Sequence, residues 1–406
     1  MKFKTNLSIL EIGEWDFAGC GYFLSQAINQ NTDSTARSVR YHPSTLGFPT
    51  DIQAPTDAEL VDLWKRADVV HIHDDYRKLP AGLQTKPTVI TYHGSLYRAT
   101  PKDYDDKAKA MGWIQTASTL DLTLLGPRWM PDTRPDLSQY VNRSPVFRAC
   151  HAPTKRKVKG TSAVLQACRK TVDLDLIENV QWSEALTRKG QCWVTIDQFQ
   201  LGYGCNAIEA WLMGQPVIGG GSDKILGAIW AQGEGIPLVV VKEDIDEIRS
   251  AIRLMQNPKN YAEMQERGHD YVNRFHSMPA VAAKALEYYH EAIETFYSRG
   301  MAYIPPPALP AQPARARLAR GKRGHRAATS ATADSGQIYL EYLGSSAGWV
   351  PFEVNGHKYK FSKLQPIQPV LLADANTFLA MRDIARRSRS EKRKRPGQLL
   401  FRRANA

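Results

Sequence analysis

The sequence contains no apolar run of the roughly 18 residues that a membrane-spanning helix requires. Cysteine is also scarce: there are five thiols, an odd number without CxxC spacing, which argues against both a disulfide framework and a zinc site. Residues 1–16 contain only a short apolar run before the first carboxylates, so we expect a first strand there and not a signal peptide. These absences predict a cytoplasmic protein without a membrane span.

Acidic residues are scarce in only one part of the chain. The formal net charge is +12, and residues 305–406 contain 19 Lys and Arg against 6 Asp and Glu, whereas residues 1–304 contain 34 against 35. The hydrophobic share of 43% and the charged share of 23% are typical of a globular protein, and 406 residues suffice for two or three domains. A nearly neutral globular body is therefore followed by a basic C-terminal quarter.

One stretch, residues 194–220, has the pattern of a phosphate site. A short apolar strand runs into a loop with Gly202 and Gly204, and a helix carrying Glu209 follows. The N-terminus of a helix presents backbone N–H groups without intrahelical partners, and the local dipole there favours an anion. We therefore predict that this loop binds a phosphate group.

The same stretch resembles the donor-binding segment of the family 4 glycosyltransferases, which have the two-domain GT-B architecture. The matching residues are Gly202-Tyr203-Gly204, Glu209-Ala210, Met213-Gly214 and Pro216-Val217. Leu201 departs from the pattern, because the family has an acidic residue at that point. The resemblance implies a nucleotide-sugar donor whose ribose hydroxyls are held by Glu209 and whose diphosphate lies on the backbone of Gly204 and Cys205.

A basic loop, residues 151–161, follows a predicted strand and precedes a predicted helix. Its sequence HAPTKRKVKGT is similar to one branch of family 4, and Asp197, before the Gly loop, matches an Asp-Gln pair of that branch. The resemblance implies that Arg156 and Lys159 bracket the donor diphosphate, whose charge must be neutralised as the sugar bond breaks. Taken alone, lysines in a loop are more often simply solvated.

A second glycine loop lies near the N-terminus, between a predicted strand over residues 7–13 and a predicted helix over residues 22–29. Gly19 and Gly21 would allow the backbone to approach a ligand closely, although a tight turn without any ligand has the same pattern. In GT-B enzymes a loop at this place faces the donor diphosphate and the acceptor. The resemblance therefore favours a cleft loop.

Histidines mark the ends of two predicted strands. His71 and His73 fall on one face of a strand over residues 68–75, so a metal pair is conceivable, but the run resembles a family strand that lines the cleft without metal. His93 follows the next strand, and its place at a carboxyl end predicts a position in the cleft. The resemblance implies that His93 contacts the transferred sugar; a structural role is the alternative. A further strand is predicted over residues 121–126.

The predicted fold class is α/β of the GT-B type, with two doubly wound Rossmann-like domains facing a cleft. The N-terminal, acceptor-side domain is predicted over residues 1–143 and the nucleotide-sugar-binding domain over residues 144–277. The last helix, residues 278–303, is expected to pack back on the first domain. Its apolar residues recur at spacings of three and four, as in an amphipathic helix.

The C-terminal quarter has a different character. Residues 304–336 are rich in Pro and Arg with few large apolar side chains, which predicts a disordered linker. Residues 337–386 predict a small β-hairpin module with a turn at Asn355-Gly356 and a helix over residues 374–385, and residues 387–406 predict a basic tail. The module is weakly similar to hairpin segments of tailed-phage proteins, which would place a phage-encoded chain in the host cytoplasm.

The predicted activity is transfer of a sugar from a nucleotide-sugar to an acceptor hydroxyl. The family resemblance implies that the reaction retains configuration and needs no metal or other cofactor. Arg156, Lys159 and His93 are the predicted catalytic residues. No side chain is a convincing general base, which suits a front-face mechanism in which the donor phosphate takes the acceptor proton. Cys205 lacks a neighbouring base that would make it a nucleophile.

The acceptor is not indicated by the sequence, but residues 305–406 would suit a nucleic acid or a virion protein, with solvated disorder as the alternative. Two other functions remain open. One is a nucleotide-sugar epimerase or hydrolase of the same fold. The other is a non-catalytic nucleotide-sugar-binding protein, which Leu201 would favour.

Overall fold

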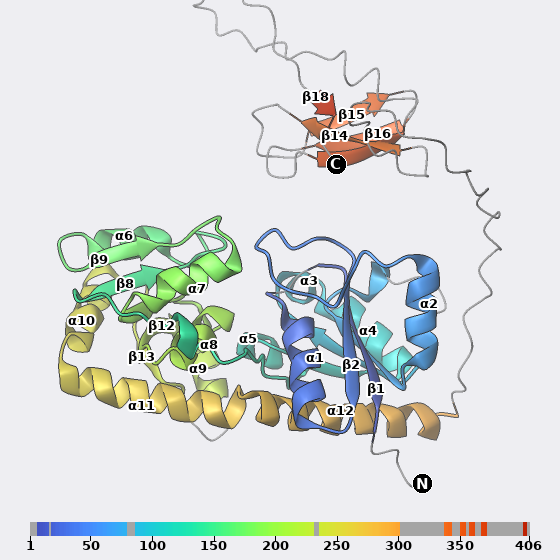
Figure 1. Cartoon of the computed structure of the whole chain (residues 1–406), viewed down its shortest axis with the longest axis horizontal. Helices are drawn as coiled ribbons and strands as arrows, with labels where there is room; N and C mark the ends of the chain where they lie inside the picture. Colours follow the sequence, from blue (N-terminus) through green and yellow to red (C-terminus); the bar gives the residue numbers. More distant parts are fainter. Residues whose placement is uncertain are drawn as a thin grey trace, which may run out of the picture. The chain divides into compact units, whose positions relative to one another are not determined.

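The computed structural model describes residues 6–15, 18–78, 86–230 and 235–300 and five later strands (Figure 1). The chain divides into two units, residues 1–311 and 312–406, which we describe separately. Within the described residues, no helix combines the length and the apolar character needed to span a bilayer.

A seven-stranded parallel sheet forms the first half of the larger unit, in the order β3-β2-β1-β4-β5-β6-β7. Its strands are β1 (Ser8–Gly13), β2 (Thr35–Arg40), β3 (Ile52–Gln53), β4 (Val69–His73), β5 (Thr88–Tyr92), β6 (Ile114–Ala117) and β7 (Arg128–Trp129). Every residue of β4 and β5 is buried, as expected where helices cover both faces of a parallel sheet. Strand β1 lies between β2 and β4, so the strand order reverses there.

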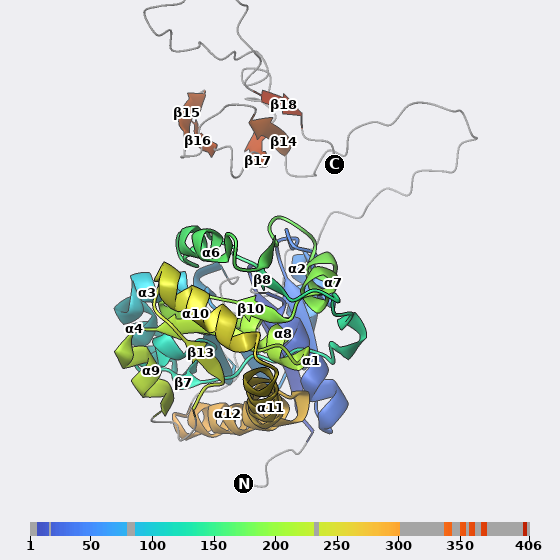
Figure 2. The ribbon, with the colours of Figure 1, turned by 90° about the vertical axis from the view of Figure 1, so that its left-hand side faces the viewer.

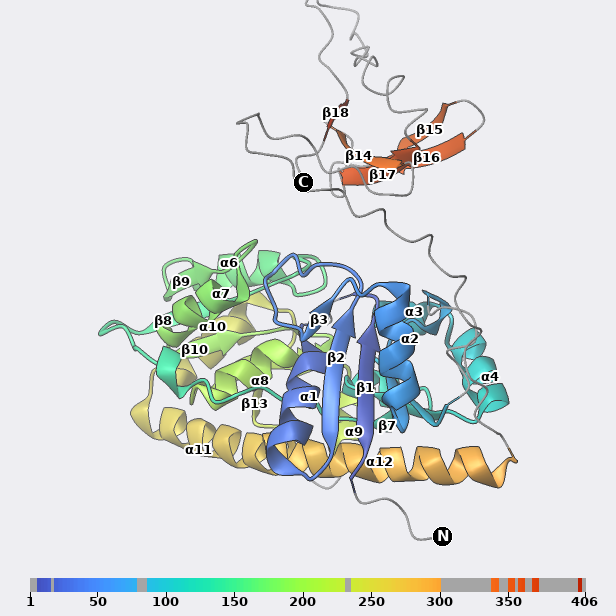
Figure 3. The same ribbon diagram turned by 45° about the vertical axis from the view of Figure 1, so that its right-hand side comes forward.

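Helices pack on both faces of this sheet. They are α1 (Cys20–Asn31), α2 (Asp57–Arg66), α3 (Ser95–Ala99), α4 (Pro101–Met111) and α5 (Leu120–Thr123). Alternate residues of β1 point to opposite faces: Ile9 packs with α1, whereas Leu10 packs with α2. The two helices lie on opposite sides of β1 and β2 in Figure 3. The capping box of Thr56 and Glu59 fixes the start of α2.

The strand predicted over residues 121–126 is wrong. The nearest preceding strand is β6, which ends at Ala117. The Leu-rich run after it forms the short helix α5, which buries Leu120 and Leu122. Asp121 accepts hydrogen bonds of 2.5 and 2.9 Å from Arg98, which holds the carboxylate in a helical turn. Alternation of leucine with polar residues predicted a strand because this tertiary contact is not visible in the sequence.

A second sheet has the order β11-β12-β10-β8-β9, with β13 also on β12. Its strands are β8 (Arg148–His151), β9 (Asp173–Leu176), β10 (Val194–Ile196), β11 (Leu201–Gly202), β12 (Val217–Gly221) and β13 (Leu238–Val240). All pairs are parallel except β11 with β12. The surrounding helices are α6 (Thr161–Cys168), α7 (Trp182–Gly190), α8 (Cys205–Leu212), α9 (Asp223–Trp230), α10 (Ile245–Met255) and α11 (Pro258–Phe275).

The long helix α12 (Met278–Ser298) follows the second sheet in sequence but packs on the first half of the unit. Val281, Ala285 and Tyr289 of α12 share a buried cluster with Ile9 of β1 and Ile28 of α1. Helices α11 and α12 lie along the same side of this unit in all three views (Figures 1, 2 and 3). The last helix therefore joins the two halves.

The C-terminal unit contains β14 (Gln337–Tyr342), β15 (Val350–Val354), β16 (His357–Phe361), β17 (Ile367–Leu371) and β18 (Phe401–Arg403). An antiparallel sheet has the order β17-β14-β18, and β15 pairs with β16. Strands β17 and β18 were not predicted, and β18 falls within the predicted basic tail. The linker over residues 304–336, the turn at Asn355-Gly356 and the helix over residues 374–385 lie outside the described residues.

Candidate functional site

A cavity of about 530 Å³ lies between the two sheets of the larger unit. The first half contributes Ala18 and the loop of residues 44–48, and the second half contributes the loops after β8 and β9 and helices α7 and α8. Its polar lining includes the side chains of Lys159, Lys189, Asn206 and Glu209. The volume lies within the range of small-molecule sites.

Lys159 reaches the cavity from the loop before α6. Its Nζ lies 2.6 Å from Oδ1 of Asp197, which also accepts a 3.3 Å hydrogen bond from Nδ2 of Asn206. Asp197 is buried, and its second oxygen, Oδ2, has no hydrogen-bond partner among the described residues. Asp197 therefore positions the cation at the cavity wall.

Glu209 lies on α8 and is only 4% exposed. Its Oε1 accepts a 2.9 Å hydrogen bond from Nε1 of Trp182 and lies 3.5 Å from Nε of Arg134, while Oε2 pairs with Nζ of Lys189. Burial opposes ionisation, but the two cations and the indole N–H outweigh it and lower the pKa of Glu209. The carboxylate is therefore ionised, and a ligand hydroxyl would have to replace one of these partners.

Trp182 connects the two halves of the unit beside Glu209. Its ring centroid lies 5.2 Å from that of Phe23 and 5.3 Å from that of Phe48. Its backbone N–H donates a 2.6 Å hydrogen bond to the carbonyl of Leu46. The first half therefore contributes to the position of a group that contacts Glu209.

The start of α8 has the backbone arrangement predicted from the glycine loop. Gly204 is the N-cap with φ −139° and ψ −166°, and no side chain caps the helix. A Cβ at Gly204 would meet nothing within 4 Å, and Cys205 and Asn206 of the first turn line the cavity. The uncapped N–H groups thus begin a helix beside open space.

Two residues of the same loop have structural contacts instead. Gly202 adopts a φ of 77° in β11 and pairs with Gly220 of β12. The hydroxyl of Tyr203 lies 2.8 Å from that of Tyr271 and 2.9 Å from Nε2 of His276, within an aromatic cluster. Neither residue lines the cavity, so the predicted donor contacts of Gly202 and Tyr203 have no counterpart in its wall.

Arg156 is also outside the cavity lining. Its Nε donates a 2.8 Å hydrogen bond to Oε1 of Glu178, and its Nη2 pairs with the other oxygen. The side chain is 60% exposed, whereas Glu178 does line the cavity. Of the two predicted diphosphate contacts, the structure therefore brings only Lys159 to the wall.

His93 belongs to a polar chain in the first half. Its Nε2 lies 2.9 Å from Nδ1 of His73, whose Nε2 lies 2.9 Å from Oε2 of Glu11. Its Nδ1 lies 3.0 Å from Oγ of Ser118. Burial lowers the pKa of His93 to about 3, so its ring is neutral at neutral pH. Hydrogen bonds at both nitrogens define its orientation.

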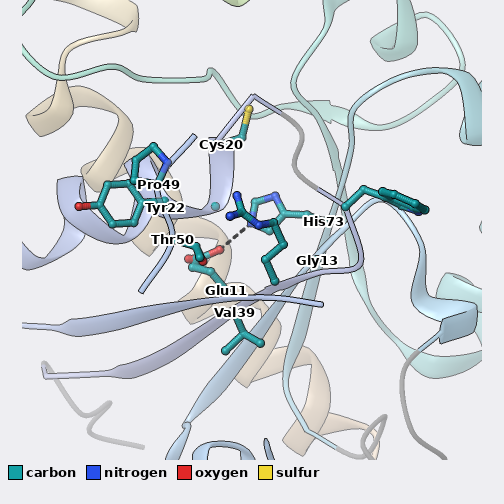
Figure 4. Close-up of a pocket in the computed structure, with 12 residues that line it drawn as sticks. Glu11, Gly13, Cys20, Tyr22, Val39, Pro49, Thr50 and His73 are labelled. Atoms are coloured by element: carbon teal, nitrogen blue, oxygen red, sulfur yellow. Dashed lines mark hydrogen bonds and ion pairs between the residues drawn. The ribbon is translucent and has the colours of Figure 1, made fainter. Parts of the chain in front are cut away.

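The predicted cleft-loop glycines lie beside this chain. Figure 4 shows Glu11 and His73 joined by their hydrogen bond in a small pocket that Gly19 and Gly21 also line. A Cβ at Gly21 would lie 3.1 Å from Nε2 of His73, so a larger residue would press on this ring. The glycine loop therefore has a packing role.

His71 lies on the same face of β4 as His73. Its Nδ1 lies 2.9 Å from the hydroxyl of Tyr289 and 2.9 Å from Oε2 of Glu11, and its Nε2 lies 2.6 Å from Oγ1 of Thr91. Every ring nitrogen of His71 and His73 thus has a hydrogen-bond partner. This geometry favours the structural interpretation over a metal pair.

Three residues of the Glu209 environment were missed by the sequence analysis: Arg134, Trp182 and Lys189. Arg134 lies in a Pro-rich segment that was interpreted only as a connection between domains, and the other two lie in a short helix without a motif. A buried lysine five residues before a strand is indistinguishable from a solvated one by spacing. No sequence signal available from one chain would have found them.

Solved structures share this architecture. A glycosyltransferase from Rickettsia africae ESF-5 is 13% identical, with a TM-score of 0.53, and the match covers 72% of this chain and 100% of that one. Anabaena Alr3699/HepE in complex with UDP and glucose is 12% identical, with a TM-score of 0.50 and coverage of 70% and 99%. A UDP-GlcNAc 2-epimerase from Neisseria meningitidis bound to UDP-GlcNAc has a TM-score of 0.44 at 13% identity, covering 69% and 98%.

No protein-family model matches the sequence, and no curated protein matches it significantly. At these identities the first two structures show the fold alone, and the third is too dissimilar to add to that assignment. The chain has the α/β GT-B fold, with two Rossmann-like halves, so the predicted fold class is confirmed. The narrower resemblance to family 4 stays a prediction.

Proposed function

We propose that the protein is a glycosyltransferase that moves a sugar from a nucleotide-sugar to an acceptor hydroxyl. The observation that carries this proposal is the cavity between the two halves, where Lys159, Glu209 and the uncapped start of α8 line one wall. A cation and a helix N-terminus suit a diphosphate, and a buried carboxylate suits a pair of ribose hydroxyls.

The main chemical task at such a site is to stabilise the diphosphate as it leaves. Lys159 supplies a positive charge that Asp197 holds in place, and the backbone N–H groups of Gly204 and Cys205 supply preorganised donors. These groups act without reorganisation because burial and hydrogen bonding already define their positions. Arg156 would join them only after leaving Glu178.

Glu209 would hold the ribose by exchanging the N–H of Trp182 or the ammonium of Lys189 for ligand hydroxyls. His93 is outside the cavity lining and has partners at both ring nitrogens, so contact with the sugar would require its ring to leave His73 or Ser118. We propose retention of configuration and no metal in the transfer step. The donor phosphate would then take the acceptor proton, since the Glu209 carboxylate is committed to cations.

The proposal is tested with Lys159→Met and the matched control Lys157→Met, which removes an exposed lysine from the same loop. Wild-type protein is incubated with UDP-, GDP-, ADP- and dTDP-sugars and an acceptor panel, and release of nucleoside diphosphate is measured with chelator present. Lys159→Met should slow release by about 10²–10³-fold, the usual effect of losing one preorganised oxyanion donor. Lys157→Met should act like wild type; equal rates for both variants would contradict the assignment.

One observation favours a second candidate, a binding protein without transferase activity. The chain has Leu201 where the family that it resembles has an acidic residue. Leu201 of β11 pairs with Gly221 of β12, so this position has no carboxylate. Wild-type protein that is thermally stabilised by a nucleotide-sugar but never releases nucleoside diphosphate would favour this function. Turnover without any acceptor would instead favour the epimerase or hydrolase alternative.

A further inference from the structure

Two cysteines that are far apart in the sequence face each other between the two halves of the larger unit. Cys20 is the first residue of α1, and Cys205 is the first residue of α8. Asp132, from the segment that connects the two sheets, completes the group, and the two sulfurs and a carboxylate oxygen all lie within 4.8 Å of one another. Cys205 Sγ donates a 3.4 Å hydrogen bond to Oδ2 of Asp132, and both thiols are free.

This donor set fits a thiophilic divalent cation. Zinc takes thiolate ligands at about 2.3 Å and carboxylate oxygens at about 2.0–2.2 Å, so tetrahedral ligand atoms lie about 3.3–3.8 Å apart. The observed atoms lie within 4.8 Å of one another, so the three side chains would have to move closer together to take up the ion. Calcium and magnesium are unsuitable, because they require oxygen ligands.

The local charges also balance. Two thiolates and one carboxylate around a divalent cation leave a net charge of −1, and the buried guanidinium of Arg134 lies close enough to interact electrostatically with all three ligands. The hydrogen bonds of Arg134 go to Oε1 of Glu209 and to the carbonyl of Thr133, so it blocks none of the three ligand atoms. The complete cluster would therefore be close to neutral, which lowers the cost of burying it.

The ion also has a route to the site. Cys205 is half-buried and lines the large cavity, whereas Cys20 is 7% exposed and lines the small pocket on the other side. A fourth ligand position can therefore be taken by water from the cavity side. The other group of suitable donors in the described chain, Glu11 with His71 and His73, is already saturated by its own hydrogen bonds.

We propose that Cys20, Asp132 and Cys205 bind one zinc ion, which joins the start of α1 to the start of α8 and so fastens the two halves together. Each thiol releases its proton to solvent as its sulfur becomes a ligand, so binding should weaken in acid. This inference is independent of the proposed transfer reaction, in which the ion takes no part. Its failure would leave the donor site unaffected.

The test uses the full chain, reduced and stripped of metal. Zinc is titrated calorimetrically, and cadmium is titrated by its thiolate charge-transfer absorbance. We expect one ion per chain for wild type, binding at least about 100-fold weaker in Cys20→Ser and Cys205→Ser, and unchanged binding in the control Cys168→Ser, a buried thiol of α6. Binding that persists in both serine variants, or no saturable binding, would overturn the proposal.

A second measurement needs no variant. Zinc should protect Cys20 and Cys205 of wild-type protein from alkylation, detected by peptide mass spectrometry, while the labelling of the other three cysteines stays the same. Equal alkylation with and without zinc would refute the site. Formation of a disulfide between Cys20 and Cys205 in the metal-free protein would also contradict the proposal that the resting protein binds zinc through these two thiols.

Discussion

Glu11 is the carboxylate that orders the buried histidines of the first half. It accepts hydrogen bonds from Tyr289 at 2.7 Å and interacts with His71 and His73 at 2.9 Å. Burial raises its pKa, but the histidine contacts more than compensate, and the net pKa falls to about 2. Because the folded-state pKa is lowered, this contribution to stability is present above pH about 4.5 and is lost as the pH falls through about 2.

Glu11→Gln should therefore lower the free energy of unfolding at pH 7 by about 3 kcal/mol, the equivalent of the change in pKa. The physical reason is that a neutral amide cannot replace the charge that the histidine contacts stabilise. Urea denaturation measures the loss, and Glu263→Gln, on the exposed face of α11, is the matched control with an expected change within about 0.5 kcal/mol. Equal stability of the two variants would show that the polar chain does not support the fold.

Buried neutral histidines should make the protein acid-sensitive before its carboxylates titrate. Burial lowers the pKa of His276 to about 4, and its Nδ1 lies 2.6 Å from the carbonyl of Asp132. The unfolded chain binds a proton near pH 6.5 while the folded chain does not, so stability falls as the pH drops from about 6.5 to 4.

His276→Asn should reduce this loss between pH 6.5 and 4 by up to about 3 kcal/mol, although the variant is less stable at pH 7. The measurement is the free energy of unfolding at several pH values. His269→Asn, an exposed position of α11, should keep the wild-type slope. A slope unchanged in His276→Asn would mean that other groups cause the acid sensitivity.

The positions of site residues could be predicted where the sequence showed a strand before them and a helix after them. Lys159 and the Gly204 loop lie between a strand and a helix, so their place at the carboxyl end of a parallel sheet followed from the pattern. The same reasoning did not predict the pairing of Arg156 with Glu178, because Glu178 lies in the loop after β9. The Glu209 partners depend on tertiary packing alone.

Among the glycines that the structure describes, Gly190 of α7 leaves the least room for a side chain. This last residue of the helix lies against the segment between the sheets, and a Cβ there would lie 1.8 Å from the carbonyl oxygen of Tyr140. A contact of that length with backbone cannot be relieved by a side-chain rotation. The helix that carries Trp182 and Lys189 therefore has its end fixed by a glycine.

Gly190→Ala should destabilise the protein by about 1–3 kcal/mol, the usual cost of overpacking. Gly227→Ala is the matched control, because a Cβ at that position of α9 meets nothing within 4 Å and alanine favours a helix. Thermal unfolding compares the two variants. If Gly190→Ala unfolds at the wild-type temperature, the distance between Gly190 and the Tyr140 carbonyl is large enough for a Cβ, which would contradict this prediction.

Elements with a strong local pattern were predicted well. The sequences of β1, β4 and β5 are rich in apolar residues, and α11 and α12 have apolar residues at helical spacing. Both patterns follow from burial, which the sequence records directly. The error at α5 arose because the contact of Arg98 with Asp121, which holds the helical turn, is not visible in the sequence. Strands β17 and β18 pair with β14 across long stretches of sequence, which no local pattern reveals.

Across the whole molecule, residues 1–304 are nearly neutral whereas residues 305–406 are strongly basic, and this contrast in charge can be tested. The proposal that residues 305–406 direct the enzyme to a nucleic-acid or virion-like acceptor rests on their 19 Lys and Arg against 6 Asp and Glu. Such binding would be driven by counterion release and would weaken steeply with salt.

Deletion of residues 305–406 should leave binding of the nucleotide-sugar intact and abolish binding to random-sequence duplex DNA, the probe for a polyanionic acceptor. In the full chain, replacing Lys392, Arg393, Lys394 and Arg395 by Gln should reduce the dependence of log affinity on log salt by up to about 4. Fluorescence anisotropy at several salt concentrations measures both. DNA binding that is unchanged by the deletion would remove the C-terminal unit from acceptor recognition.

The most direct test of the whole account is a crystal structure of the protein soaked with UDP, GDP, ADP and dTDP in turn. We predict that one of them occupies the cavity, with its diphosphate within hydrogen-bond distance of Lys159 Nζ and the N–H of Cys205, and with Glu209 on its ribose. A nucleotide bound elsewhere, or one whose diphosphate contacts neither Lys159 nor the start of α8, would contradict the proposed glycosyltransferase site.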